Sequence, residues 1–243
     1  MRVFCFPYAG GGPSAFRGWA NGIRDVEFCY VHAPGRENRI REKPFSDIHL
    51  LMNALTAEMA EWLDRPYALY GHSLGGVVAF EFARAARRRG WREPLHLFIS
   101  AARAPHLSSP HPKMHHLHDV ELLAEVNRRY GGVPPELMHD REARQLLVPC
   151  LRADLTLLET YEYVRAEPLD CQITCFGATQ DKIVTREALQ PWSLHSKQEL
   201  RLHIVDGGHL FLQTARTTLL EKIRAALTPT PFPTFDTVQP FSV

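Results

Sequence analysis

Residues 67–76 read YALYGHSLGG: an apolar run, the pattern Gly-x-Ser-x-Gly, and the start of a helical pattern that continues to Arg89. A strand, a very sharp turn and a helix, in this order, present a serine hydroxyl above the edge of a sheet. Glycine suits residues 71 and 75 because side chains there would clash in so tight a turn. The helix N-terminus adds partial positive charge where an oxyanion would form. We therefore predict that Ser73 is a catalytic nucleophile; the alternative is a glycine turn with a purely structural role.

The rest of the chain alternates short apolar runs with helical patterns. Near-continuous apolar strands separated by amphipathic helices indicate an α/β protein, with a mostly parallel sheet covered by helices on both faces. The expected strands are Val3–Phe6, Val26–Val31, Tyr67–Tyr70, Leu95–Ser100, Gln172–Phe176 and Leu200–Val205, and the expected helices are Ile48–Leu63, Leu74–Arg89 and Leu210–Leu227.

One long stretch, between Ser100 and Gln172, interrupts this alternation. Its first part is rich in Pro, Ser and His, and helical patterns follow over Val120–Tyr130 and Glu142–Val164. Because a long insertion between two strands is usually either functional or disordered, its helical periodicity favours a functional cap. We predict one domain over residues 1–227, with a core of 1–103 and 166–227, a helical lid at about 104–165 inserted before the last two strands, and a Pro-rich C-terminal tail at 228–243.

Composition narrows the class of protein. The 243 residues carry 28 Lys and Arg against 27 Asp and Glu, a balance that argues against a protein built to coat nucleic acid or a membrane. No apolar run is long enough to span a bilayer, and Pro7 cuts short the only run that could begin a signal peptide. The five scattered cysteines read as buried free thiols in a reducing compartment. We expect a cytoplasmic protein, monomeric because nothing in the composition suggests an obligate interface.

A serine nucleophile needs a base, and the base needs an acid to orient it. In this architecture the chain order is Ser, then Asp or Glu, then His, each after a strand. The last expected strand ends in Asp206-Gly207-Gly208-His209, which places His209 in a tight loop before the final helix. We predict that His209 is the general base, against the alternative of a structural loop histidine.

Asp181 is the predicted acid because it lies in the loop after the penultimate strand. Asp154 falls inside an expected lid helix, and Asp170 precedes its strand and should lie at the wrong end of the sheet. Asp206 shares the loop of the histidine and has little room to reach back to its ring. The alternative for Asp181 is a solvated carboxylate paired with Lys182.

Two backbone N–H groups should hold the oxyanion of the intermediate. One is expected from Leu74, the residue after the nucleophile, and the other from Ala9 in the glycine-rich loop after the first strand, with Tyr8 as the alternative donor. That loop lacks the Lys-Ser/Thr ending of a P-loop and a complete G-x-G-x-x-G, which argues against nucleotide binding.

Two side-chain clusters have ordinary explanations. The histidines at 106, 111, 115, 116 and 118 have no cysteine partner and no regular metal spacing, so we expect a surface loop and no metal site. The arginines at 84, 87, 88 and 89 suit a helix C-terminus, although an acidic partner could dock there. We expect no cofactor.

Several ordered motifs resemble the stand-alone (type II) thioesterases that accompany nonribosomal peptide and polyketide synthases, and the match runs from the first strand to about Leu227. The family's opening F-P-x-A-G-G is similar to residues 6–11, and its P-G-R-x-x-R-x-x-E segment to residues 34–42. Residues 71–81 resemble its nucleophile elbow and helix, residues 151–161 its helix from cap to core, and residues 207–212 its histidine loop.

The resemblance implies an α/β-hydrolase fold and the hydrolysis of acyl groups from the phosphopantetheine thiol of acyl or peptidyl carrier proteins, which clears stalled or misprimed chains. Ser73, His209 and Asp181 would form the triad, with the N–H groups of Ala9 and Leu74 as the oxyanion hole. The alternatives are a general carboxylesterase or lipase, a product-releasing thioesterase or cyclase, and a carrier-binding module without activity. Fold alone does not separate them.

Overall fold

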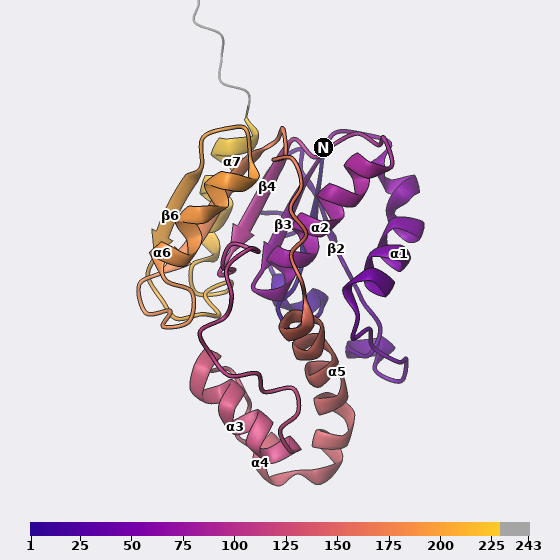
Figure 1. Cartoon of the computed structure of the whole chain (residues 1–243), viewed down its shortest axis with the longest axis vertical. Helices are drawn as coiled ribbons and strands as arrows, with labels where there is room; N and C mark the ends of the chain where they lie inside the picture. The colour runs from indigo at the N-terminus through magenta and orange to yellow at the C-terminus, as the bar shows by residue number, and fades with distance from the viewer. Residues whose placement is uncertain (229–243) are drawn as a thin grey trace, which may run out of the picture.

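A computed structural model describes residues 1–228, and the Pro-rich tail predicted at 228–243 lies outside them except for Thr228. The sheet is parallel throughout, with strand order β2-β1-β3-β4-β5-β6 (Figure 1). Each predicted strand is present: β1 (Arg2–Phe6), β2 (Glu27–Tyr30), β3 (Tyr67–His72), β4 (His96–Ser100), β5 (Gln172–Ala178) and β6 (Arg201–Val205).

Helices cover both faces of the sheet, as the apolar strands predicted. Alternate residues of a strand point to opposite faces. Phe4 and Phe6 of β1 therefore pack with α1 (Ile48–Met59) and α2 (Leu74–Arg88), whereas Val3 and Cys5 pack with α7 (Arg216–Leu227) on the other face. Short helices complete the layers: η1 (Pro13–Phe16), η2 (Glu37–Arg39), η3 (Ala60–Leu63), α6 (Arg186–Leu189) and η4 (Gln190–His195).

The stretch between β4 and β5 holds three helices, which we call the helical insertion: α3 (Asp119–Tyr130), α4 (Glu136–His139) and α5 (Arg141–Thr160). Its apolar residues form a cluster of their own, centred on Leu122, Leu123 and Leu155. Figure 1 shows the insertion gathered at one end of the sheet. Because these helices bury apolar faces against one another, their apolar residues recur at helical spacing, which is the pattern that the sequence analysis used.

Two helix boundaries differ from the sequence prediction. The helix expected over 142–164 ends at Thr160 because the following segment is bound to α2: the Tyr161 hydroxyl donates to Glu81 Oε1 at 2.7 Å, and Arg84 donates to the carbonyl of Val164. The helix expected from Leu210 begins at Arg216. Phe211 is buried in the turn before it, so it contributes to the core without being helical.

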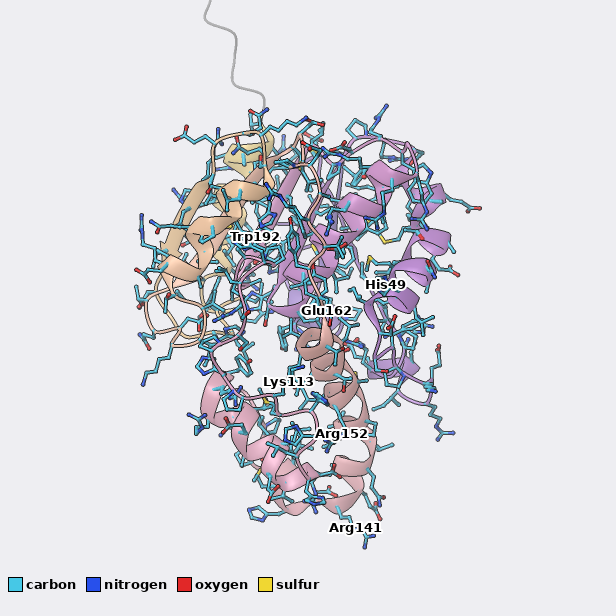
Figure 2. The ribbon with its side chains drawn as sticks, in the orientation of Figure 1. His49, Lys113, Arg141, Arg152, Glu162 and Trp192 are labelled. Atoms are coloured by element: carbon cyan, nitrogen blue, oxygen red, sulfur yellow. The ribbon has the colours of Figure 1, made fainter. Side chains whose placement is uncertain are left out.

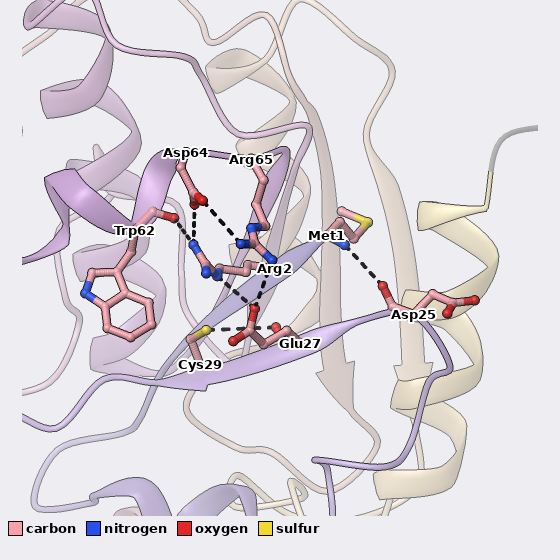
Figure 3. Close-up of polar contacts among 8 residues, drawn as sticks. All are labelled: Met1, Arg2, Asp25, Glu27, Cys29, Trp62, Asp64 and Arg65. Carbon is pink, nitrogen blue, oxygen red and sulfur yellow. Dashed lines mark hydrogen bonds and ion pairs between the residues drawn. The ribbon is translucent and has the colours of Figure 1, made fainter.

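The N-terminal strand is fixed to its neighbours by charge (Figure 3). Arg2 donates to the Glu27 carboxylate on β2 at 2.8 Å and to the carbonyl of Trp62 at 2.8 Å, and it also pairs with Asp64. These contacts join β1, the edge strand β2 and the segment before β3. None of the helices in residues 1–228 is both long and apolar enough to cross a membrane.

Candidate active site

Ser73 occupies the sharp turn between β3 and α2 that the sequence predicted. Its φ of 54° lies in the left-handed region, which a non-glycine residue rarely adopts. A Cβ at Gly71 would lie 2.0 Å from the Gly75 carbonyl oxygen, and one at Gly75 would lie 2.1 Å from that of Phe6. Glycine is therefore required at both positions, and the Ser73 hydroxyl is held above the C-terminal edge of the sheet.

The structure brings Ser73, His209 and Asp181 together, although 136 residues separate Ser73 from His209. His209 Nε2 lies 2.9 Å from Ser73 Oγ, and His209 Nδ1 lies 2.8 Å from Asp181 Oδ2. Because a carboxylate only accepts, Nδ1 carries the proton, which leaves Nε2 free to accept from the serine hydroxyl. The arrangement suits a serine nucleophile with a histidine base and an orienting acid.

Asp181 is buried and its charge is well compensated. Its Oδ1 accepts from the N–H groups of Ile183 at 2.9 Å and Val184 at 3.0 Å. Burial raises the pKa of this carboxyl, but the hydrogen bond from His209 and the two backbone N–H groups outweigh it, so the pKa lies below its ordinary value. Asp181 is therefore ionised throughout the neutral range, as an orienting acid requires.

The three side chains meet because their strands are parallel. Ser73 follows β3, Asp181 follows β5, and His209 follows β6, so all three lie at the C-terminal edge of one sheet. The chain changes direction across the sheet between β1 and β3, the position where open α/β sheets form a crevice. The loop carrying Ala9 leaves β1 at this point.

One predicted oxyanion donor lines the cavity of the nucleophile, and the other follows the nucleophile in the chain. Tyr8 and Ala9 line the same cavity as Ser73 and His209, and Leu74 is the first residue of α2. The loop after β1 is shaped by a turn, in which the Gly11 N–H donates to the carbonyl of Tyr8 at 2.9 Å. The oxyanion role of Ala9 and Leu74 stays a prediction.

Two cavities open on Ser73 and His209, and Tyr130 lines both. The first has a volume of about 400 Å³, and the second of about 370 Å³. The first runs beneath the helical insertion and is largely apolar, with side chains from Leu123, Val126, Leu137, Leu151, Leu155 and Leu158 among its lining. We call it the apolar cavity.

A family model described as thioesterase domain matches residues 1–227. The chain belongs to this family. The gramicidin S biosynthesis protein GrsT of Aneurinibacillus migulanus is 35% identical to this thioesterase over 234 residues, covering 94% of this chain and 91% of that protein.

Solved structures agree with this assignment. The RedJ thioesterase of the prodiginine biosynthetic pathway in Streptomyces coelicolor has a TM-score of 0.86 and 38% identity, covering 93% of this chain and 90% of its own. YbtT, described as a type II thioesterase from the yersiniabactin pathway, has a TM-score of 0.84 and 30% identity, covering 93% of this chain and 92% of its own. The predicted fold class, enzyme class and resemblance are confirmed.

The carboxylates rejected as triad acids have other partners in this thioesterase. Asp170 pairs with Arg87 at 2.9 Å and Lys197 at 2.7 Å, away from the site, and Asp206 accepts from the Thr179 hydroxyl at 2.8 Å. Asp154, in contrast, is buried and reaches the loop after β1, a role that the sequence analysis missed.

Asp154 and Arg36 form a buried ion pair that holds this loop. Arg36 Nη1 and Nη2 each lie 3.0 Å from a carboxylate oxygen of Asp154, and Nη1 also donates to the carbonyl of Gly11 at 2.9 Å. Asp154 in turn accepts from the Gly10 N–H at 2.7 Å. Two residues beside the predicted donor Ala9 are thus fixed by a pair that joins α5 to the core.

His72 is a second residue that the sequence analysis missed. Its Nε2 donates to the carbonyl of His209 at 2.9 Å, and its Nδ1, left as acceptor, lies 2.9 Å from Ser100 Oγ. Complete burial lowers its pKa to about 3. The neutral ring therefore ties the backbone of the predicted base to β3 and β4.

Two histidines of the 106–118 cluster and two arginines of the 84–89 cluster have partners within the chain. His106 Nδ1 lies 2.8 Å from His195 Nε2, and His115 pairs with Glu159 at 2.6 Å. Among residues 1–228 there is no group of three or more His, Cys, Asp or Glu side chains placed to hold a metal. Arg84 pairs with Glu81 at 2.5 Å and Arg87 with Glu93 at 2.6 Å, near the end of α2 remote from Ser73.

Buried neutral histidines predict a loss of stability in mild acid. Burial lowers the pKa of His72 and His96 to about 3 and that of His195 to about 4, whereas unfolded histidine titrates near 6.5. Between these values the unfolded chain binds more protons than the native one, so the free energy of unfolding should fall as pH drops from about 6.5 to 4. Urea unfolding at pH 7.5, 6 and 5 measures the slope.

A matched pair of variants isolates this effect. His195→Asn should flatten the slope, whereas replacing the exposed His49 of α1 by asparagine should leave it unchanged (Figure 2). Equal free energies of unfolding at pH 7.5 and 5 would contradict the linkage.

Proposed function

We propose that this thioesterase hydrolyses acyl groups from the phosphopantetheine arm of acyl or peptidyl carrier proteins, clearing stalled or misprimed chains in nonribosomal peptide or polyketide synthesis. The observation that supports it best is the chain of hydrogen bonds from Asp181 through His209 to Ser73, open to an apolar cavity beneath a helical insertion. Such a cavity suits an acyl chain, and GrsT, RedJ and YbtT are described as biosynthetic pathway proteins.

Acylation begins when Ser73 Oγ attacks the thioester carbonyl while His209 Nε2 takes its proton. Asp181 stabilises the imidazolium that forms, and the N–H groups of Ala9 and Leu74 hold the oxyanion. The carbon–sulfur bond then breaks, and His209 returns the proton to the departing thiolate. The products are an acyl-serine ester and the free thiol of the arm.

Deacylation repeats the sequence with water. His209 Nε2 removes a proton from water as its oxygen attacks the ester carbonyl, and a second oxyanion forms in the same place. The bond to Ser73 Oγ breaks, the serine recovers its proton from His209, and the carboxylic acid leaves. No step in this scheme is assigned to a metal or a cofactor.

Intact-mass spectrometry of an acetyl-loaded carrier protein tests the proposal. The loaded carrier is incubated with the parent enzyme and with Ser73→Ala as the blank, beside acetyl-CoA and a simple oxygen ester. We expect the carrier to lose the acetyl mass with the parent enzyme only, and faster than acetyl-CoA at equal concentration.

Hydrolysis by Ser73→Ala at the parent rate would contradict the serine mechanism. Turnover of the oxygen ester while the carrier stays loaded would keep the triad and identify a general esterase instead. Binding of the loaded carrier without any turnover would indicate the non-catalytic module.

A further inference from the structure

The second cavity at the site differs from the apolar one in its charge. It shares Ser73, Tyr130, Leu158 and His209 with the apolar cavity but lies on the side of the loop that follows β4. The Tyr130 ring lies 4.7 Å from the His209 ring and lines both cavities. The basic residues that line the second cavity, which we call the basic cavity, are Arg103, His111, Lys113 and Arg129.

Arg129 and the one acidic residue of this lining already have partners. Arg129 is paired with Glu125 at 2.6 Å. Glu159, the acid, accepts from the backbone N–H groups of Met114 and His115 and from the His115 ring. Arg129 is therefore compensated by Glu125, and the Glu159 carboxylate is directed toward the backbone of residues 114–115 and the His115 ring.

Arg103 and Lys113 are the cations of this lining that form no ion pair within residues 1–228. Within the described part of the chain, neither has a carboxylate at ion-pair distance. Arg103 is partly buried, and its guanidinium donates to the carbonyls of Ser108 at 2.7 Å and Ile183 at 3.2 Å. These two bonds fix the group and use two of its five N–H donors, so three are left for another acceptor.

Lys113 lies on the loop that leads from β4 to the helical insertion (Figure 2). Arg152 of α5 holds this loop by donating to the carbonyls of His115 and Leu117. The position of Lys113 at the cavity wall is therefore set by the insertion, while that of Arg103 is set by the core.

We propose that the basic cavity receives the thiol arm of the substrate and that Arg103, assisted by Lys113, binds the phosphate of that arm. This inference rests on the proposed function. A thioester carbonyl at Ser73 has two substituents, which must leave in different directions. The apolar cavity suits the acyl group, and a fixed guanidinium with free N–H donors suits a phosphate. Arg103 thus selects thioesters whose leaving arm carries a phosphate.

The test compares two substrates that differ only in that phosphate: butyryl-phosphopantetheine and butyryl-pantetheine. The readout is the ratio of their kcat/KM values within each variant, so a partial folding defect cancels. We expect the parent enzyme to favour the phosphorylated substrate about tenfold or more, the usual worth of a hydrogen bond to a charged group. Arg103→Gln should bring the ratio close to one, and Arg103→Lys should keep part of the preference.

Arg128→Gln is the matched control, because Arg128 is an exposed arginine of α3 that pairs with Glu125 and lines neither cavity. Its ratio should equal that of the parent enzyme. An Arg103→Gln ratio equal to the parent ratio, or a parent ratio near one, overturns the inference.

Calorimetry tests the phosphate site independently of the thioesterase reaction. Phosphopantetheine and pantetheine are titrated into the parent enzyme and into Arg103→Gln. We expect tighter binding of phosphopantetheine, lost in the variant, whether or not either thioester is hydrolysed. Absence of hydrolysis with this binding pattern would refute the thioesterase reaction and support the anion site, whereas equal binding of the two thiols would refute the site.

Discussion

Asp181→Asn is expected to lower kcat about ten-thousandfold while the protein stays folded, the size of loss seen when a serine triad loses its acid. The reason lies in how the carboxylate is held. Asp181 Oδ1 accepts from the N–H groups of Ile183 and Val184, and an asparagine can keep both bonds only with its oxygen in that place. Its NH2 group then faces His209 Nδ1.

An NH2 group at that position reverses the tautomer of the base. Because it donates to Nδ1, the imidazole proton moves to Nε2, the nitrogen 2.9 Å from Ser73 Oγ. The base can then no longer accept the serine proton, although the geometry is unchanged. Single-turnover acylation with a chromogenic thioester, beside the thermal midpoint of unfolding, separates this loss from a loss of fold.

Asp206→Asn is the matched control for the acid. This carboxylate lies on the loop of His209 and is bound by the Thr179 hydroxyl, so we expect its kcat to stay within about twofold of the parent value. A large loss of kcat in Asp206→Asn, together with a loss below tenfold in Asp181→Asn, would show that Asp206 is the acid of the triad.

The strands could be predicted because each is a short apolar run bounded by polar or turn residues. The β3–α2 connection was the clearest, since Gly71 and Gly75 are required by backbone atoms only a few residues away or on the adjacent β1. The ends of the helices were harder to predict from the sequence. α5 stops at Thr160 through contacts with Glu81 and Arg84, side chains about 80 residues earlier, and no local pattern records such a contact.

The functional residues differ in the same way: some follow from local sequence patterns, and others depend on contacts between distant residues. Ser73, Asp181 and His209 follow strands in a fixed chain order, so their positions could be inferred. His72 and Asp154 act across 137 and 118 residues, respectively, and no local pattern records such contacts. The signal for Asp154 was a charged residue on the apolar face of a lid helix, which requires a buried partner.

The pair of Arg36 and Asp154 gives the other large expected effect. Asp154→Ala should lower the free energy of unfolding by about 3–5 kcal/mol, because it leaves the Arg36 guanidinium buried without its partner. It should also reduce kcat about a hundredfold, since the Gly10 N–H loses its acceptor and the loop that carries Ala9 loosens. Urea unfolding and steady-state kinetics measure the two losses.

Asp119→Ala provides the control on stability. Asp119 pairs with Arg152, also on α5, but its side chain is half exposed, so we expect a cost of at most about 1 kcal/mol. If Asp119→Ala lowered the free energy of unfolding as much as Asp154→Ala, burial would not explain the difference expected between the two ion pairs.

A double variant separates the structural role of the pair from its role at the site. Arg36→Met combined with Asp154→Leu removes both charges, and apolar replacements of a buried pair are often neutral or stabilising. Stability should therefore recover, whereas kcat should stay low because no acceptor is restored for the Gly10 N–H. Recovery of kcat together with stability would mean that the pair serves the fold alone, and that the loop beside Ser73 holds its shape without the Asp154 carboxylate.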